Sequence, residues 1–416
     1  MCSALNAQQP FVSNFDEAKI GNIPIPDVLT CEDGTKITSK EAWLAKRKPE
    51  LMKLFEREEY GKTPAAKPPA LRFIVTSENK NALGGKATMR QVTIYFTDKD
   101  SPRCDILLYL PNERKTPAPC FVSLNFGGNH AVADDPAIKL AQGWFRDDAK
   151  KGYVSNHATE QTRASSAQRW PVAEIIARGY GVCTAYYGDL EPDQAEGFSS
   201  GVRPLFLKDG QSAPAADEWG AIGAWAWGLS RMADYLTTLP EVDAKKLAVL
   251  GHSRLGKTSV WAGAQDERFS IVISNDSGAG GAALSKRIFG ETVERLNKNF
   301  PNWFCGNFKK YNDNEAALPI DQHELLALIA PRPVYIASAT QDLWSDPKGE
   351  FLGGMLAEPV YALFGKKGLG VNEPPAPDTS VGDFIGYHNR TGKHDILPYD
   401  WEQYMNFADK HWGKPE

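Results

Sequence analysis

Strand-like and helix-like stretches alternate along the second half of this 416-residue chain, and this alternation limits its possible folds more than any other feature. Apolar runs typical of buried strands occupy residues 182–185, 247–251, 269–274 and 334–339. Patterns typical of helices occupy residues 170–178, 215–238, 255–264, 323–329 and 399–412. This order predicts an α/β fold in three layers, with a mostly parallel sheet between helices on both faces.

The first part of the chain has a different pattern. Short apolar and β-branched runs, separated by turn residues, predict consecutive strands that begin antiparallel, at residues 71–76, 87–97, 104–110 and 120–124. Residues 1–68 mix prolines and charges with one helical stretch at 39–61, whose apolar residues Trp43, Leu44, Leu51, Leu54 and Phe55 recur at helical spacing. We therefore expect one domain over residues 1–416, on which residues 1–68 pack as an N-terminal arm.

Two long stretches, residues 127–168 and 364–393, have no regular pattern. Loops of this length inside a domain are typically functional or disordered. The linker-like segment 368–378 is too short and too late in the chain to separate a second domain.

Charge and cysteine content exclude several classes of protein. The chain has 47 Lys and Arg against 52 Asp and Glu, a net charge of −5, so no overall basic surface is available for nucleic acid. The absence of an apolar run of about 18 residues excludes a transmembrane helix. The six cysteines, Cys2, Cys31, Cys104, Cys120, Cys183 and Cys305, are dispersed and form no CxxC pair. They predict buried thiols rather than a zinc site or a disulfide framework.

A strand, a tight turn and a helix meet within residues 247–264, and the turn has two interpretations. It satisfies the phosphate-loop pattern GxxxxGK[ST] from Gly251, in which backbone amides and Lys257 would hold a nucleotide. It also resembles a nucleophile elbow, which would hold Ser253 above the sheet beside the backbone amides of a helix N-terminus.

Three observations favour the elbow. The turn follows several strands rather than an early one, its interior is not rich in glycine, and Asp276 is very close along the chain for a Mg²⁺-binding partner. Downstream of Ser253 the chain also offers an acid and a histidine in the order found in α/β hydrolases. The sequence therefore favours a hydrolase and leaves a P-loop NTPase as the alternative from another class.

The elbow departs from the common G-x-S-x-G form because Gly256 lies three residues after Ser253. Arg254, directly after the serine, is expected to donate to a developing oxyanion together with its own backbone N–H, and each such donor is often worth about 3 kcal/mol. The alternative is that Arg254 only pairs with a nearby carboxylate.

The catalytic base is expected on a loop after the last strands. His394 lies on the loop before the last predicted helix and is the predicted base, with His388 the next candidate. His252 is expected to be structural, because its ring would point away from the neighbouring serine hydroxyl. His323 and His411 lie in helical patterns and are expected to pack or form hydrogen bonds.

The acid that orients the histidine should follow a strand near the end of the sheet. Asp342 is the carboxylate nearest to the end of the strand at 334–339 and is the predicted acid. Asp276, after the preceding strand, is the competitor. Asp346 precedes a proline and is expected to cap a turn.

Together, six short segments resemble the glucuronoyl esterases of carbohydrate esterase family 15. They are GHSRLGK at 251–257, NDSGAGG at 275–281, LIAPRP at 328–333, QDLW at 341–344, GKHD at 392–395 and RWP at 169–171. The resemblance runs from roughly residue 162 to the C-terminus, and Ser-Arg-x-Gly-Lys is its most specific element. It implies an α/β-hydrolase fold and an enzyme that needs no metal or cofactor.

Carried over by matching motif, the resemblance implies that Ser253 is the nucleophile, Arg254 the oxyanion stabiliser and His394 the base. It further implies substrate-binding roles for Lys257, Trp344 and Glu291. Lys257 and Glu291 would contact uronate hydroxyls, while Trp344 would pack on the sugar ring and donate its indole N–H. The structural alternatives are a solvated helix lysine and a packed loop aromatic.

The chain departs from the fungal members at two positions. They have a cysteine where this chain has His252, and a glutamate acid where it has Asp276. Bacterial members commonly have the acid after the next strand, which matches Asp342.

The resemblance implies a serine carboxylesterase that cleaves the ester between 4-O-methyl-D-glucuronic acid of glucuronoxylan and lignin alcohols, through an acyl-enzyme. An acetyl esterase acting on xylan and a catalytically silent carbohydrate-binding relative are the alternatives within the fold. We expect a monomer. A polymeric substrate also implies export, although MCSALNAQQP at the N-terminus has no signal-peptide pattern. Cys2 is interpreted as a lipoprotein cleavage residue or as an incidental cysteine.

Overall fold

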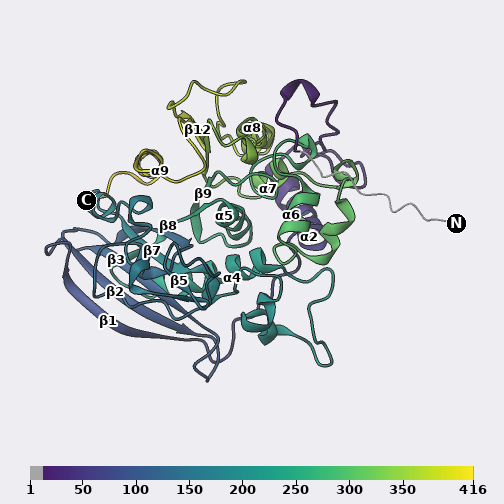
Figure 1. Cartoon of the computed structure of the whole chain (residues 1–416). Coiled ribbons are helices and arrows are strands. Elements are labelled where there is room, and N and C mark those ends of the chain that lie inside the picture. Colours follow the sequence, from purple (N-terminus) through teal and green to yellow (C-terminus); the bar gives the residue numbers. More distant parts are fainter. Residues whose placement is uncertain (1–12, 416) are drawn as a thin grey trace.

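The computed structural model describes residues 13–415, and a ten-stranded mixed sheet runs through it (Figure 1). Its strands are β1 (Arg72–Ala82), β2 (Ala87–Tyr95), β3 (Arg103–Pro111), β4 (Ala118–Asn125), β7 (Gly181–Tyr186), β8 (Val242–His252), β9 (Phe269–Asn275), β10 (Val334–Ala339), β11 (Val381–Gly382) and β12 (Ile385–Arg390). A separate two-stranded sheet joins β5 (Tyr153–Val154) and β6 (His157–Ala158), inside the long stretch predicted to be irregular.

The strand order is β1-β2-β3-β7-β4-β8-β9-β10-β12-β11. The pairs from β1 to β7 are antiparallel, and those from β7 through β12 are parallel. The parallel strand β4 is buried at every residue, because helices cover both of its faces. The predicted parallel sheet with N-terminal antiparallel strands is therefore confirmed, and Figure 1 shows β1–β3 at one end of the molecule and β12 at the other.

Helices cover the sheet on both faces. They are α1 (Lys40–Ala42), α2 (Lys48–Glu58), α3 (Val172–Ala177), α4 (Ala221–Leu236), α5 (Arg254–Gln265), α6 (Val293–Asn299), α7 (Gln322–Ala327), α8 (Pro347–Leu363) and α9 (Pro398–Trp412). Side chains of α2 and α4 to α8 share one buried apolar cluster, and those of α3 and α9 share a second. Within β4, Val122 belongs to the first cluster and its neighbour Phe121 to the second, as a strand between two helical layers requires. The three-layer prediction is confirmed.

The N-terminal helix forms as one continuous stretch, because α1, a π-helical segment (Trp43–Arg47) and α2 follow each other without a break. Trp43, Leu51 and Phe55 are fully buried, and the ring of Phe55 lies 6.5 Å from that of Trp261 in α5. Leu44 is exposed, so its assignment to the apolar face was wrong. A π-helical turn shifts the angular position of its residues, which a plain 3.6-residue period does not anticipate.

Strand β12 lies inside residues 364–393, which the sequence predicted to be irregular. Its sequence is polar, yet His388 and Arg390 are buried because both contact Asp400 of α9: His388 Nε2 lies 2.8 Å from Oδ1, and Arg390 Nε lies 2.9 Å from Oδ2. An apolar-run criterion misses a strand whose buried side chains are satisfied by ion pairs.

Helix α8 has no counterpart among the predicted elements. It contains Gly353, Gly354 and Pro359, all poor helix formers, but its N-terminus is capped by Asp346, whose carboxylate accepts from Gly349 N at 2.9 Å. A side chain at Gly353 would collide with the carbonyl of Ala282. Close packing against the body of the protein therefore outweighs helix propensity here. Asp346 is a cap, as predicted, but of a helix.

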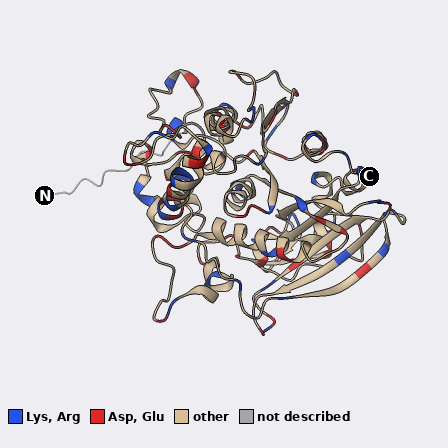
Figure 2. Cartoon of the chain, turned by 180° about the vertical axis from the view of Figure 1, so that it is seen from behind, with Lys and Arg blue, Asp and Glu red and all other residues tan. Residues whose placement is uncertain are grey.

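Within residues 13–415, the cysteines are buried thiols and the charged residues form no basic surface, as the sequence predicted. Cys31, Cys104, Cys120, Cys183 and Cys305 are buried free thiols, whereas Cys2 lies outside the described residues. No helix of the described part is long and apolar enough to cross a membrane. Basic and acidic residues are interspersed over the elements rather than separated into patches of one sign (Figure 2).

Candidate active site

The turn after β8 holds Ser253 in a strained conformation. Its φ of 59° and ψ of −130° are unusual for a residue other than glycine, and they occur where a strand turns sharply into a helix, α5. A Cβ at Gly251 would lie 1.7 Å from the carbonyl oxygen of Leu255, and one at Gly256 would lie 3.0 Å from that of Asn275. The two glycines are thus explained by close approach of strand and helix.

Lys257 does not point out of the turn. Its side chain is only 2% exposed, and Nζ donates to the carbonyls of Ser277 and Ala279 at 2.6 Å and to Oε2 of Glu291 at 2.5 Å. An ammonium group has three donors, and all three are used here. A phosphate-binding lysine must reach into solvent, so this geometry contradicts the NTPase alternative.

His394 and Asp342 meet at the carboxyl edge of the sheet. Nδ1 of His394 lies 2.6 Å from Oδ2 of Asp342, and the histidine side chain remains 38% exposed. The loops that carry them are held together because the pairing of β10 with β12 continues beyond the strands: Thr340 N donates to Arg390 O and Gln341 N to Gly392 O, each at 2.8 Å.

The environment of Asp342 favours its ionised form. Burial acts to raise the pKa of this carboxyl, but the hydrogen bond and charge of His394, with hydrogen bonds from Ser345, lower the pKa below its ordinary value. A carboxylate at this distance favours the tautomer of the histidine in which Nδ1 carries the proton and Nε2 does not.

Asp276 lies in the same group but has different contacts. One carboxylate oxygen of Asp276, one of Asp342 and one ring nitrogen of His394 all lie within 4.8 Å of one another. Oδ2 of Asp276 accepts from Asp395 N at 3.3 Å, while Oδ1 has no hydrogen-bond partner among the described residues. Burial, followed by the charges of Glu350, Asp342 and Asp400, raises the pKa of Asp276 well above its ordinary value.

His388 and His252 occupy structural positions. His388 is fully buried between Tyr335 and Asp400, so it cannot be the base. His252 packs 4.5 Å from the His394 ring and its Nδ1 lies 2.5 Å from Oδ1 of Asn275. Burial, then the charges of His394 and Arg169, lower the pKa of His252 well below its ordinary value. The structural role predicted for His252 fits these contacts.

Arg254 is anchored by a carboxylate that the sequence analysis did not single out. Its guanidinium pairs with Oδ2 of Asp193, and Oδ1 of Asp193 accepts from the indole of Trp303 at 2.8 Å. Tyr187 donates to Asp193 at 3.1 Å, and the Trp303 ring lies 4.7 Å from the guanidinium carbon. The alternative that Arg254 pairs with a carboxylate is thus observed, and it fixes the side chain beside Ser253.

Glu291 links Lys257 to Trp344. Its Oε2 accepts from Lys257 and its Oε1 accepts from the Trp344 indole at 3.1 Å, while Glu291 N donates to the Trp344 carbonyl at 3.0 Å. Trp344 is half-buried, and Glu291 is 7% exposed. The three residues for which the resemblance implied substrate contacts are therefore one hydrogen-bonded cluster.

Comparisons with known proteins show which family the chain resembles. A family model for the fungal glucuronyl esterases matches residues 214–365. A carbohydrate esterase from an unknown prokaryotic organism is 49% identical over 404 residues, which cover 97% of this chain and 93% of the relative. A glucuronoyl esterase structure from Solibacter usitatus is 51% identical with a TM-score of 0.91, covering 96% of this chain and all of that one. The chain belongs to carbohydrate esterase family 15.

Membership in family 15 establishes the fold and the class of enzyme. The fold is that of the α/β hydrolases, and the protein is a carboxylic ester hydrolase. A family 15 esterase from a marine bacterial metagenome, described as promiscuous, matches with 49% identity, a TM-score of 0.89, and coverage of 96% of this chain and all of that one. A 4-O-methyl-glucuronoyl methylesterase from Phanerochaete carnosa is 30% identical over 83% of this chain and 74% of the relative.

Sequence reasoning about this family 15 esterase missed two carboxylates that support the site. Asp193 follows the carboxyl end of β7, and Glu350 in α8 accepts from Ser277 N at 2.7 Å and Gly278 N at 3.0 Å, next to the carbonyls that hold Lys257. Asp193 could have been found by listing the acids just beyond each parallel strand. Nothing local in the sequence marks Glu350.

Proposed function

We propose that this family 15 esterase is a serine carboxylesterase that hydrolyses the ester between 4-O-methyl-D-glucuronic acid of glucuronoxylan and lignin alcohols. The observation that carries the proposal is the 2.6 Å contact between His394 and Asp342 at the sheet edge on which Ser253 forms a strained elbow. The name of the Phanerochaete carnosa relative, a 4-O-methyl-glucuronoyl methylesterase, supports the choice of acyl group.

In the proposed first step, Ser253 Oγ attacks the ester carbonyl and His394 Nε2 accepts the hydroxyl proton. Asp342, hydrogen-bonded to Nδ1, stabilises the imidazolium that forms. The carbon–oxygen bond to the alcohol then breaks, the alcohol oxygen receives the proton from His394, and the uronoyl group remains on Ser253. A water molecule activated by His394 releases the uronic acid by the reverse proton path.

Arg254 is the proposed stabiliser of the oxyanion, together with its own backbone N–H at the start of α5, since the first N–H groups of a helix have no acceptor in a preceding turn. Asp193 and Trp303 fix the guanidinium before substrate arrives, so little reorganisation is needed when charge develops on the carbonyl oxygen.

Lys257, Glu291 and Trp344 are the proposed uronate-binding set. The carboxylate of Glu291 suits a sugar hydroxyl, and the half-exposed ring of Trp344 suits the apolar face of a pyranose. Lys257 holds Glu291 in place, and it contacts a substrate hydroxyl by exchanging one of its two carbonyl bonds. No metal or cofactor takes part in the proposal.

The test is the ratio of kcat/KM for methyl glucuronate to that for p-nitrophenyl acetate. The proposal predicts a clear preference for the uronate ester. Equal or faster turnover of the acetate would favour the acetyl esterase alternative, which the promiscuity of the marine relative keeps relevant.

We further propose that residues 1–416 act as one catalytic domain, with residues 1–68 as an arm packed on it. The shared apolar cluster of α2 and α5 supports this proposal for the described part of the arm. Export and a monomeric state stay predictions.

A further inference from the structure

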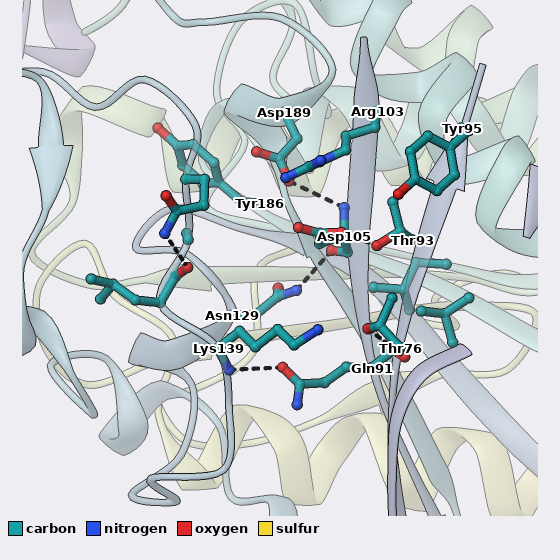
Figure 3. A pocket seen from close by; sticks show the side chains of 15 residues that line it. Thr76, Gln91, Thr93, Tyr95, Arg103, Asp105, Asn129, Lys139, Tyr186 and Asp189 are labelled. Carbon is teal, nitrogen blue, oxygen red and sulfur yellow. Dashed lines mark hydrogen bonds between the residues drawn. The ribbon is translucent and has the colours of Figure 1, made fainter. Parts of the chain in front are cut away.

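A pocket of about 390 Å³ with many polar side chains in its lining lies on one face of β2 and β3, and Ser253, His394 and Asp342 do not line it (Figure 3). Gln91 and Thr93 of β2 and Arg103 and Asp105 of β3 contribute to it. Its other wall comes from residues 139–142, part of the long loop after β4, and from Tyr186 and Asp189 at the end of β7. The long irregular stretch 127–168 therefore builds part of a binding-sized cavity.

The pocket lies along the same edge of the sheet as the proposed active site. Thr93 pairs with Asp105, and Ile106 with Ala185, so the pocket sits at the carboxyl end of β7. Ser253 follows the carboxyl end of β8, which is parallel to β7 through β4. The segment after β7 also runs from Asp189 in the pocket to Asp193, which anchors Arg254.

The pocket continues into a second hollow. This hollow, of about 360 Å³, is also lined by Arg103, Asp105, Gln142 and Asp189, and it extends to Trp144 and Ser200. Two adjoining hollows that share one wall form an elongated depression. Such a shape suits several linked units of a polymer better than one compact ligand.

The chemistry of the lining suits an uncharged polar ligand. Arg103 and Lys139 bring positive charge, and Asp105 and Asp189 bring acidic groups (Figure 3). Burial, then the negative charge of Asp105, raises the pKa of Asp189 to about 8, so at neutral pH its carboxyl both donates and accepts a hydrogen bond. A polyanion would meet the Asp105 carboxylate, a cation would meet Arg103 and Lys139, and an apolar ligand would leave these polar groups unpaired.

Several of these groups have unused hydrogen-bonding capacity. Among residues 13–415, the structure gives no hydrogen bond to the guanidinium of Arg103, the ammonium of Lys139 or Oδ1 of Asp189. The rest of the lining is held rigid: Thr93 donates to Asp105 at 2.5 Å, and Gln91 accepts from Lys139 N at 2.8 Å. A rigid frame that presents unpaired donors and acceptors is what hydroxyl-rich ligands require.

We infer that this depression binds an uncharged run of β-linked pyranoses, the xylan-type backbone whose uronic acid branch carries the ester cleaved at Ser253. The inference rests on the proposed function for the identity of the polymer. Backbone binding here and ester cleavage at Ser253 are separate contacts with one substrate chain, so each is measurable without the other.

The direct test is calorimetric titration of the full chain with xylohexaose, which carries neither charge nor ester. We expect saturable binding that weakens about ten-fold in Arg103→Met, the effect of losing hydrogen bonds from a charged group. Lys139→Met, at an exposed side chain, is the second variant and is expected to weaken binding in the same direction. Arg114→Met removes a guanidinium just beyond the opposite end of β3 and should bind as wild type does.

The kinetic test compares two esters, benzyl glucuronate and a glucuronate ester carried on a xylo-oligosaccharide. Arg103→Met should lower the ratio of kcat/KM for the large ester to that for the small one, whereas Arg114→Met should leave it unchanged. Turnover of benzyl glucuronate without any binding of xylohexaose would overturn this inference while upholding the proposed function. Binding of xylohexaose that neither Arg103→Met nor Lys139→Met weakens would place the sugar elsewhere and also overturn it.

Discussion

Nδ1 of His394 lies 2.6 Å from Oδ2 of Asp342, while Asp276, within the same 4.8 Å group, accepts one backbone N–H and leaves its other carboxylate oxygen without a partner among the described residues. The two acids that the sequence left as alternatives thus differ in their contacts and in the direction of their pKa shifts. The pKa of Asp342 lies below its ordinary value and that of Asp276 well above it. Only an ionised carboxylate stabilises an imidazolium, so the geometry favours Asp342 as the acid of the proposed triad.

Asp342→Asn is therefore expected to lower kcat on a glucuronate ester by about ten-thousandfold, because an amide no longer stabilises the charged histidine or selects its tautomer. Asp276→Asn, the matched control, should cost about ten-fold or less by the same reasoning. Steady-state kinetics of the two variants decides between the acids. A larger loss in the Asp276 variant would reverse the assignment.

Arg254→Met should lower kcat about a hundredfold with little change in KM, since an oxyanion donor acts mainly in the transition state. Asp193→Asn should lower kcat in the same direction but less, because Arg254 remains and loses only its anchor. Arg114→Met serves as a control for the loss of one guanidinium. A rise in KM at unchanged kcat would instead mean that Arg254 binds the ground state.

Lys257→Met should destabilise the fold by about 3–5 kcal/mol, because the buried Glu291 carboxylate loses its ion-pair partner. Adding Glu291→Gln should restore part of this loss. Lys208→Met is the control, because Lys208 also forms an ion pair, with Glu218 at 2.8 Å, but its side chain is 77% exposed. It should lower the free energy of unfolding by about 1 kcal/mol or less. Urea unfolding measures all three. If Lys257→Met lowered the free energy of unfolding by about 1 kcal/mol or less, Lys257 would not stabilise the fold as we expect.

Glu350 provides a pH-dependent prediction. Burial raises its pKa to about 8, so the folded protein keeps this carboxyl protonated up to a higher pH than the unfolded chain does. Stability from this group is complete below the ordinary glutamate pKa near 4.5 and is lost as the pH rises towards 8. Glu350→Gln mimics the protonated form, and its amide can donate to Ser338 Oγ, which lies 2.6 Å from Oε2.

The free energy of unfolding should thus fall less in Glu350→Gln than in wild type between about pH 5 and pH 8, by an amount on the order of 3 kcal/mol. Denaturant unfolding at the two pH values gives the difference directly. Parallel slopes in both proteins would show that Glu350 does not titrate in this range.

Much of the fold could be predicted because its central strands are continuous apolar runs and its helices α4 and α9 have clear helical patterns. Strand β12 and helix α8 could not, for opposite reasons. The buried His388 and Arg390 of β12 are satisfied by Asp400, a residue of the next helix, and α8 forms despite three glycines and an internal proline because its packing is close. Both effects depend on tertiary contacts that no local pattern contains.

The candidate site also has contacts that could be predicted from the sequence and contacts that could not. The contact between His394 and Asp342 could be predicted because both follow neighbouring parallel strands, and Ser253 follows another strand of the same sheet. The contacts of Arg254 and Lys257 depend on Asp193 and Glu291, which are distant in sequence and recognisable only once the fold is known. For Lys257, the phosphate-loop pattern was a coincidence of two glycines that strand–helix packing requires.

The most direct test of the central proposal is alcohol release from benzyl glucuronate by wild type and by Ser253→Ala, with p-nitrophenyl acetate measured beside it. The account predicts rapid release of benzyl alcohol by wild type and a loss of about ten-thousandfold or more in the variant, since the acyl-enzyme cannot form. Unchanged release by a folded Ser253→Ala protein, or no release by wild type, would contradict it.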